Sequence, residues 1–188
     1  MKQAAKVALA ATAVAAVGAT VVLKSGLLKT GPVGNTNVPE PAKPVDLTRY
    51  AGRWYEFARY DNRFERGCDD VTADYTIRAD GKVDVLNASR SGAGGERVRT
   101  ATGRAKVVPG SNNAKLKVSF FGPFYVGDYW VLDRADDYAW SIVGEPRGRY
   151  LWVLTRSAQI DPGDAEALVG RVRALGYDTS LLRLTLHR

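Results

Sequence analysis

Residues 50–59 read YAGRWYEFAR, and they mark the point where a Pro-rich, irregular composition gives way to a pattern of strands. Gly52 comes just before a run in which Trp54 and Glu56 alternate with Tyr55 and Phe57. An alternation with a period of two residues is typical of a β-strand, because successive side chains point to opposite faces. We therefore expect the first strand of a folded domain to begin here.

Short segments of the same alternation recur through the rest of the chain and are separated by turn-forming residues. The clearest hairpin signals are Asp80-Gly81 and Pro146-Arg147-Gly148. Short connections make sequential strands neighbours in the sheet. Eight such segments precede a helix, namely residues 53–60, 70–78, 82–90, 96–107, 114–121, 127–133, 138–145 and 149–156.

The predicted sheet has one apolar face. Ala73 and Tyr75 alternate with polar residues in the second segment, and Leu116, Val118 and Phe120 do so in the fifth. Such a sheet must pack on a second sheet or close on itself, and a closed barrel of eight strands has room for one small ligand. We predict an all-β fold, an eight-stranded antiparallel up-and-down barrel, with a β-sandwich as the structural alternative.

A helix follows the eighth strand. Asp161 is a predicted N-cap, Pro162 fits the first helical position and Gly176 fits the C-terminal cap. Four apolar residues then share one helical face: Leu168, Val169, Val172 and Leu175. We expect this helix to pack outside the barrel, with a last short strand at residues 182–186.

The first 45 residues differ in character from the rest. Lys2 and Lys6 precede an uncharged Ala/Val-rich run at residues 7–23, which predicts a signal peptide or an N-terminal signal anchor, with cleavage possible after Ala19. Residues 24–45 read as a Pro/Gly-rich linker unable to bury a core. The barrel domain is then predicted to span residues 46–188.

Charge and rare residues exclude several functions. Residues 1–45 hold +4 of the formal net charge of +7, and the remaining charges are interleaved, so nucleic-acid binding is not expected. Cys68 is the only cysteine and His187 the only histidine, which leaves no material for a disulfide, a metal site or a nucleophilic triad. We expect His187 to be a solvated side chain near the chain end. No cysteine follows the apolar run, so we do not expect a lipidated lipoprotein.

Several segments together resemble one family. Besides residues 50–59, they are FERG at 64–67, VTA at 71–73, VSFFGPF at 118–124 and YLWVLTR at 150–156. They are similar to the bacterial outer-membrane lipocalin group, which is related to apolipoprotein D, over nearly all of residues 46–188. The resemblance implies an up-and-down barrel that binds a small ligand.

The resemblance also assigns a structural motif to the closed end of the barrel. The start of the first strand, the turn after the sixth and the end of the eighth lie at the same end of such a barrel, and we expect Arg156 to cover Trp54 there. The motif residues are Gly52, Trp54, Asp137, Tyr138 and Arg156. None of them is expected to contact a ligand.

The alternation predicts which residues line the interior. The ligand-binding candidates are Glu56, Ala73, Tyr75, Val85, Asn87, Leu116, Val118, Phe120, Tyr129, Trp152 and Leu154. The connections after odd-numbered strands lie at the open end, where the mouth candidates are Phe64, Phe121, Phe124 and Tyr125. Aromatic rims favour amphipathic ligands whose head group stays wet.

Two residues keep alternative interpretations. A buried carboxylate at Glu56 needs a partner or a proton, so it either orients a ligand or satisfies a structural hydrogen bond. Cys68 lies where relatives often carry a disulfide cysteine, but its partner is missing here. We expect an unpaired thiol in a loop, with intermolecular pairing or oxidation sensing as alternatives.

These observations favour an exported lipid-binding protein that stores or transports a small amphipathic ligand, of the fatty acid or lysophospholipid class, for cell-envelope maintenance or stress response. It would lie in the periplasm or cell envelope, with possible membrane association through the N-terminal run, as a monomer or homodimer without cofactor or metal. The alternatives are an isomerase-like enzyme using Glu56 and Tyr75, and a structural barrel packed solid by Trp130, Trp140 and Trp152.

Overall fold

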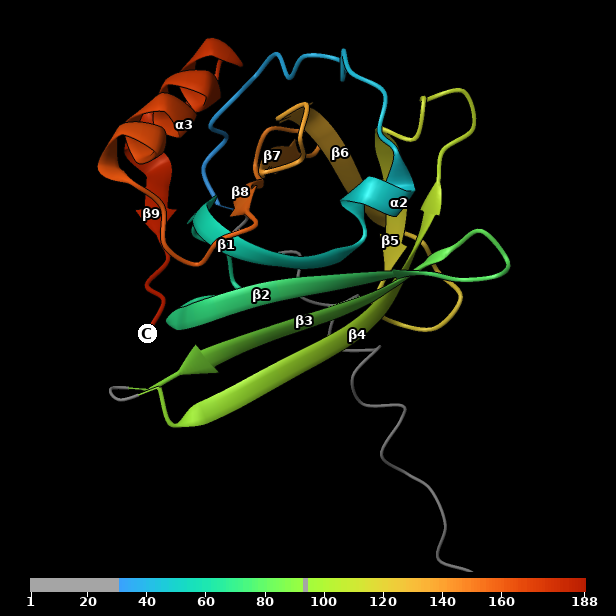
Figure 1. The fold of residues 1–188 in the computed structure, drawn as a ribbon, viewed down its shortest axis with the longest axis horizontal. Helices are drawn as coiled ribbons and strands as arrows, with labels where there is room; N and C mark the ends of the chain where they lie inside the picture. The colour runs from blue at the N-terminus through green and yellow to red at the C-terminus, as the bar shows by residue number, and fades with distance from the viewer. Residues whose placement is uncertain (1–30, 93–94) are drawn as a thin grey trace, which may run out of the picture. The chain divides into compact units, whose positions relative to one another are not determined.

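The computed structural model describes residues 31–92 and 95–188. The chain divides into two units after Thr30, and residues 31–188 form the second unit. These residues form one antiparallel sheet in which each strand pairs with the next (Figure 1). The first eight strands are β1 Gly52–Tyr60, β2 Cys68–Ile77, β3 Val83–Ser91, β4 Arg97–Val107, β5 Lys115–Ser119, β6 Gly127–Arg134, β7 Trp140–Gly144 and β8 Leu151–Thr155.

The sheet closes through β1, which pairs with β8 on one edge and with β2 on the other. The result is the closed, eight-stranded up-and-down barrel that the sequence predicts. The predicted strand bounds differ from the observed ones by a few residues, because the alternation continues into turns where the ladder has ended. A ninth short strand, β9 Leu182–Leu184, pairs with β1 and extends the sheet.

Residues that pair directly across an antiparallel ladder share a face, so the register separates inside from outside. Trp54 lies opposite Ala73, and Ala73 lies opposite Asn87. These residues, with the buried Val85, Leu116 and others, form the inner apolar surface. The alternation predicted from the sequence therefore holds for most of the barrel.

A short helix, α2 Leu47–Tyr50, covers the closed end of the barrel just before β1. The guanidinium of Arg156 lies 3.7 Å from the centroid of the Trp54 ring, as the motif predicts. The same guanidinium donates to the Arg49 and Ala51 carbonyls at 2.7 and 3.0 Å. Arg156 thus joins the end of β8 to the end of α2 and covers an indole with no exposed surface.

The rest of the predicted closed-end motif has backbone roles. Gly52 has φ +90°, in the left-handed region that a side chain would strain. Tyr138 adopts φ +66° in the turn between β6 and β7, and its hydroxyl accepts from the Asp46 backbone N–H. Asp137 accepts from the Ala139 backbone N–H at 3.0 Å and fixes the same turn.

The long helix α3 Pro162–Ala174 packs on the outer face, as expected, and lies beside β9 in Figure 1. Leu168 and Val172 are buried against outward-facing residues such as Ile142 and Val153. Gly176 takes φ +85° after the helix, as predicted. Asp161 occupies the N-cap position, but its side chain makes no capping hydrogen bond, so the capping part of that prediction is wrong.

The described part of the expected linker, residues 31–45, lies along the barrel and is partly buried. Val45 is buried in the closed-end cluster, and Val38 packs beside α3. Asn35 donates to the Leu175 carbonyl at 2.9 Å, and the Gly34 N–H donates to the Gly148 carbonyl. The linker prediction is wrong here because proline and glycine content describes backbone shape and does not exclude docking on a neighbouring surface.

The C-terminal segment completes the barrel wall. One edge of β1 pairs with β2 over Gly52 to Tyr55 and then with β9 from Ala58 onward. Where β1 and β2 separate, the Thr185 N–H donates to the Phe57 carbonyl, and the Leu186 carbonyl accepts from the Asp70 N–H. The C-terminal segment therefore bridges the two strands, and we call this place the seam.

We predict that Arg156→Ala lowers the free energy of unfolding by about 2–3 kcal/mol, because it removes a cation–π contact and charged hydrogen bonds together. The matched control is Arg171→Ala, whose guanidinium lies 4.6 Å from the Trp140 ring on the outside of the protein. That change should cost less than about 1 kcal/mol. Urea unfolding measures both, and equal losses would contradict the role given to Arg156.

Candidate functional site

The residues predicted to line a ligand site face the barrel interior by register. Ala73, Asn87, Leu116, Tyr129 and Leu154 are all paired with other inward residues. The same holds for four more of the predicted residues: Tyr75, Val85, Val118 and Trp152. The structure thus brings these nine side chains to one surface.

Part of the inner surface stays accessible. Ala73, Asn87 and Trp152 face inward and yet keep accessible surface. Trp130 and Trp140, which the solid-barrel alternative needed inside, belong to the outer cluster beneath α3. That part of the alternative is wrong, because both residues alternate with inward neighbours. An accessible inner surface is what a buried small ligand requires.

Hydroxyl groups form a chain near the closed end. The Tyr75 and Tyr129 hydroxyls are 3.0 Å apart, Tyr129 is 2.9 Å from Tyr50, and Tyr50 is 3.0 Å from Ser141. Burial raises the pKa of Tyr50 to about 12 and raises the pKa values of Tyr75 and Tyr129 well above their usual value. These phenols therefore stay neutral and serve as hydrogen-bonding groups, not as bases.

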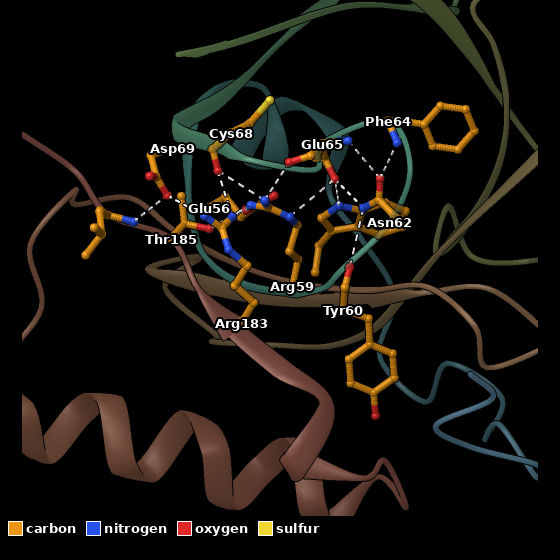
Figure 2. A network of polar contacts seen from close by, with 12 residues as sticks. Glu56, Arg59, Tyr60, Asn62, Phe64, Glu65, Cys68, Asp69, Arg183 and Thr185 are labelled. Carbon is orange, nitrogen blue, oxygen red and sulfur yellow. Dashed lines mark hydrogen bonds and ion pairs between the residues drawn. The ribbon is translucent and has the colours of Figure 1, made fainter. Parts of the chain in front are cut away.

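A second polar cluster lies at the seam (Figure 2). The Glu56 carboxylate accepts hydrogen bonds from the Arg59 guanidinium and the Thr185 hydroxyl. Arg59 also donates to the carbonyls of Glu65 and Cys68, at 2.7 and 3.1 Å. Glu56 and Arg59 are 2% and 0% exposed, so this ion pair is enclosed by protein.

The alternation did not predict Arg59 inside the barrel. It places Ala58 inside and Arg59 outside, but the register of β1 shifts between Glu56 and Ala58. After this bulge Ala58 faces the outer cluster and Arg59 lies opposite Trp152 on the inner face. A single extra residue reverses the facing of everything after it. The buried charge of Glu56 was the only signal that a cation had to be near.

Glu65 connects this cluster to the mouth. Its carboxylate accepts from the Trp152 indole N–H at 3.0 Å and from the Asn62 amide at 2.5 Å. The Asn62 side chain in turn accepts from the backbone N–H of Phe64 and of Glu65, both at 3.0 Å. The loop between β1 and β2 is thus fixed to the inner wall, and its Phe64 ring lies 6.4 Å from Tyr150.

Two carboxylates share the one guanidinium of Arg59. Glu56 is bonded to it directly, and the Glu65 carboxylate lies 4.0 Å from its Nε atom. Burial, followed by repulsion from Glu65, raises the pKa of Glu56 to about 7, against the opposing effects of Arg59 and Thr185. Glu56 therefore gains or loses a proton near neutral pH.

The predicted mouth residues are largely exposed. Phe64, Phe121 and Phe124 are 60%, 83% and 70% exposed, and Tyr125 lies beneath the Lys106 ammonium at 4.8 Å. Phe120, predicted as an inner residue, follows the end of β5 and is partly exposed with its ring against Gly103. It lies between the lining and the mouth, since β5 ends one residue earlier.

An open hollow of about 480 Å³ lies on the outer face of β1 and β2, away from the predicted lining. It is polar and includes Arg53, Arg90 and His187. Its position excludes it as the entrance to the barrel interior.

Comparison with known proteins agrees with the geometry. The sequence profile of the lipocalin-like domain matches residues 45–187. The chain belongs to the lipocalin family. The outer membrane lipoprotein Blc of Vibrio cholerae is 44% identical over 154 residues, which cover 79% of this chain and 88% of that protein. Apolipoprotein D of Macaca fascicularis is 30% identical over 162 residues, with 81% and 82% covered.

Solved structures agree on the fold. Insecticyanin from the tobacco hornworm Manduca sexta superposes with a TM-score of 0.62 at 20% identity, over 84% of this chain and 85% of that chain. At this identity the likeness concerns architecture alone. The resemblance to outer-membrane lipocalins and apolipoprotein D, inferred from sequence motifs, is confirmed.

Two expectations about single residues of this lipocalin are wrong. His187 is not solvated: its side chain is 7% exposed, and its Nε2 atom lies 2.9 Å from the Glu56 carbonyl oxygen. Cys68 is not in a loop: it begins β2, and it is free and buried. Both lie in or beside the seam: His187 belongs to the C-terminal segment, and the Cys68 carbonyl accepts from Arg183 of that segment. Within residues 31–92 and 95–188, no group of side chains has the composition of a metal site.

The enzyme alternative needs Glu56 and Tyr75 to act together. In the structure Glu56 bonds to Arg59 and Thr185, whereas the Tyr75 hydroxyl bonds to Tyr129. The two groups belong to different networks, and no hydrogen bond joins them among the described residues. The geometry favours the structural interpretation of Glu56 over a direct role toward a ligand.

The raised pKa of Glu56 predicts a pH dependence of stability. Because the folded state holds this proton more tightly than the unfolded state, the associated stability is complete below about pH 4.5 and is lost as pH rises to about 7. Relative to Glu56→Gln, which cannot titrate, the wild type should lose up to about 3 kcal/mol across this window. Urea unfolding at a series of pH values measures the difference.

The Glu65→Gln variant tests the cause of this titration. Removing the second carboxylate should lower the pKa of Glu56 and move the loss of stability to lower pH. Parallel pH curves for the wild type and Glu56→Gln would contradict the assignment.

Proposed function

We propose that this lipocalin binds a small amphipathic lipid, of the fatty acid or lysophospholipid class, in the barrel interior and stores or transports it for cell-envelope maintenance or stress response. The observation that carries the proposal is an inner surface that is apolar, sealed at one end by Arg156 and Trp54, and still accessible at Ala73, Asn87 and Trp152. The family membership supports a binding role.

Burial of an acyl chain supplies sufficient free energy. Each methylene transferred from water to an apolar surface contributes about 0.8 kcal/mol, and micromolar affinity corresponds to about 8 kcal/mol. A chain of roughly ten buried methylenes therefore reaches this range before the costs of ordering are counted. The inner residues Val85, Leu116, Val118 and Leu154 are of the right chemistry for such a chain.

Polar side chains in the barrel interior can orient a bound ligand. The Asn87 amide faces inward and has no hydrogen bond to any described side chain or backbone group, so its donor and acceptor are open to a ligand. The phenols hydrogen-bond to one another, and Glu56 and the terminal nitrogens of Arg59 already have hydrogen-bond partners in the protein, whereas the Arg59 Nε atom has none among the described residues. We infer that Asn87 contacts the ligand, while the head group lies at the open end near Glu65 and the mouth aromatics.

Binding without catalysis fits the site better than turnover. The titrating Glu56 is enclosed with its partners, and the phenols stay protonated at neutral pH. The relatives named above are a lipoprotein, an apolipoprotein and a lipocalin-fold protein, and none is named as an enzyme.

A location in the cell envelope is part of the proposal. The Vibrio cholerae relative is named an outer membrane lipoprotein, and the N-terminal run of this chain predicts export. That run lies outside the described residues, and within the described residues no helix is long and apolar enough to cross a membrane. Attachment through the N-terminal run therefore stays a prediction.

We predict that Ala73→Phe weakens binding of a fluorescent fatty acid by at least about tenfold, because it fills accessible space on the inner wall. The matched control, Thr100→Phe, adds the same ring on the outer face of β4 and should bind like the wild type. Direct titration of each purified protein provides the affinities, and circular dichroism checks the fold.

Native mass spectrometry of the wild type, followed by organic extraction, identifies any lipid that co-purifies. The absence of both a bound lipid and probe displacement would refute the proposal. If Ala73→Phe and Thr100→Phe weakened fatty-acid binding equally, the fluorescent probe would not bind in the barrel interior.

A further inference from the structure

The connection between β5 and β6, residues 120–126, exposes an unusual amount of apolar surface. It reads FFGPFYV, and Phe121, Phe124 and Val126 are 83%, 70% and 81% exposed. Large apolar side chains that gather on a surface mark an interaction site, whereas scattered ones do not. The loop contains no charged residue. We call residues 120–126 the aromatic loop.

The loop is held in this exposed form by its own contacts. The buried Ser119 hydroxyl donates to the Gly122 carbonyl at 2.9 Å, and Gly122 takes φ +64° in the turn. Phe120 packs on Gly103 at one side, and Tyr125 lies beneath Lys106 at the other. Both ends are therefore anchored to β4, and the rings of Phe121 and Phe124 point away from the apolar core.

The charges beside the loop are mainly positive. Lys117 is paired with Asp128 at 2.5 Å, and Arg104 lies 3.7 Å from Asp84. Lys106 has no carboxylate within 4 Å among the described residues, and it lies 4.8 Å above the Tyr125 ring. Along the same strand, the exposed Arg97 and Arg99 also form no ion pair with a described residue.

The loop between β1 and β2 also exposes an aromatic ring beside a cation. Phe64 is 60% exposed, and the guanidinium of Arg63 lies 4.8 Å from the centroid of its ring. Both loops follow odd-numbered strands and so belong to the open end of the barrel. Aromatic side chains with cations beside them suit the boundary between lipid tails and anionic head groups.

We propose that the aromatic loop docks the open end of the barrel on an anionic lipid bilayer, with Phe121, Phe124 and Val126 entering the boundary between head groups and acyl chains. Charge argues for a bilayer over a second copy of the chain. The barrel domain carries an excess of positive charge, so two copies would bring like charges together at this surface. The proposal does not depend on which ligand the interior holds.

The test measures binding of the full chain to vesicles of phosphatidylcholine with and without phosphatidylglycerol. Phe121→Ser/Phe124→Ser should weaken partition into the anionic vesicles by at least about tenfold, because two exposed rings are lost from the contact. The matched control is Leu86→Ser/Val98→Ser, which removes exposed apolar residues from the outer face of β3 and β4. It should partition like the wild type.

A fluorescent dye attached to the aromatic loop reports whether the loop itself contacts the bilayer. Val126→Cys can be labelled with an environment-sensitive dye, since Cys68 is buried and free. Anionic vesicles should shift the dye emission to the blue, and salt should reverse the shift. All variants carry the N-terminal run. If the protein bound vesicles through that run alone, the aromatic loop would not meet the bilayer, and the dye emission would not change.

Equal partition of the wild type and Phe121→Ser/Phe124→Ser, or no dye shift on vesicles, would overturn the proposal. In the absence of lipid, the dye emission could instead shift as the protein concentration rises. Such a shift, together with a doubled molecular mass of the protein, would overturn the bilayer proposal in favour of self-association. Fatty-acid binding by the wild type in solution, measured without vesicles, reports the proposed function separately.

Discussion

The closure of one sheet on itself through a single strand, β1, is the constraint on which the rest of the structure depends. The inner face of the sheet is apolar, and closing the sheet hides that face without a second sheet. One edge of β1 pairs with β8, and the other must serve both β2 and the C-terminal segment. The bulge after Glu56 makes this double pairing possible by turning the second half of the strand.

The consequences of that bulge reach the polar groups of the interior. It brings Arg59 inside, where Glu56, Thr185 and two carbonyls accept hydrogen bonds from its terminal nitrogens, while its Nε atom is buried without a hydrogen-bond partner in the described part of the chain. The C-terminal segment then has a structural reason to lie in the seam, since it supplies Thr185 and since Arg183 donates to the Cys68 carbonyl (Figure 2). Most buried polar groups are thus committed to holding the wall, which leaves Asn87 and the apolar lining for a ligand.

Local patterns predicted the strands, the closed end and the lining because each depends on nearby sequence. Alternation determines facing within one strand, and the parity of strands puts Arg156 and Trp54 at the same end of the barrel, where the family resemblance implied their contact. The failures involve residues whose environment is set from a distance. Arg59 was not among the predicted interior residues, because one bulge turns it inward. His187 and residues 31–45 were misjudged because long-range docking buries residues of any local composition.

The central claim is that a lipid chain lies inside the barrel, and the tryptophans offer the most direct measurement of it. Trp152 faces the accessible interior, Trp54 is fully buried at the closed end, and Trp130 and Trp140 lie outside beneath Lys115 and Arg171. A fatty acid carrying a nitroxide on its chain quenches only indoles that it approaches closely. Titrated into the wild type and Trp152→Phe, it should quench a large part of the wild-type emission and little of the variant's, whereas equal quenching in both proteins would contradict the account.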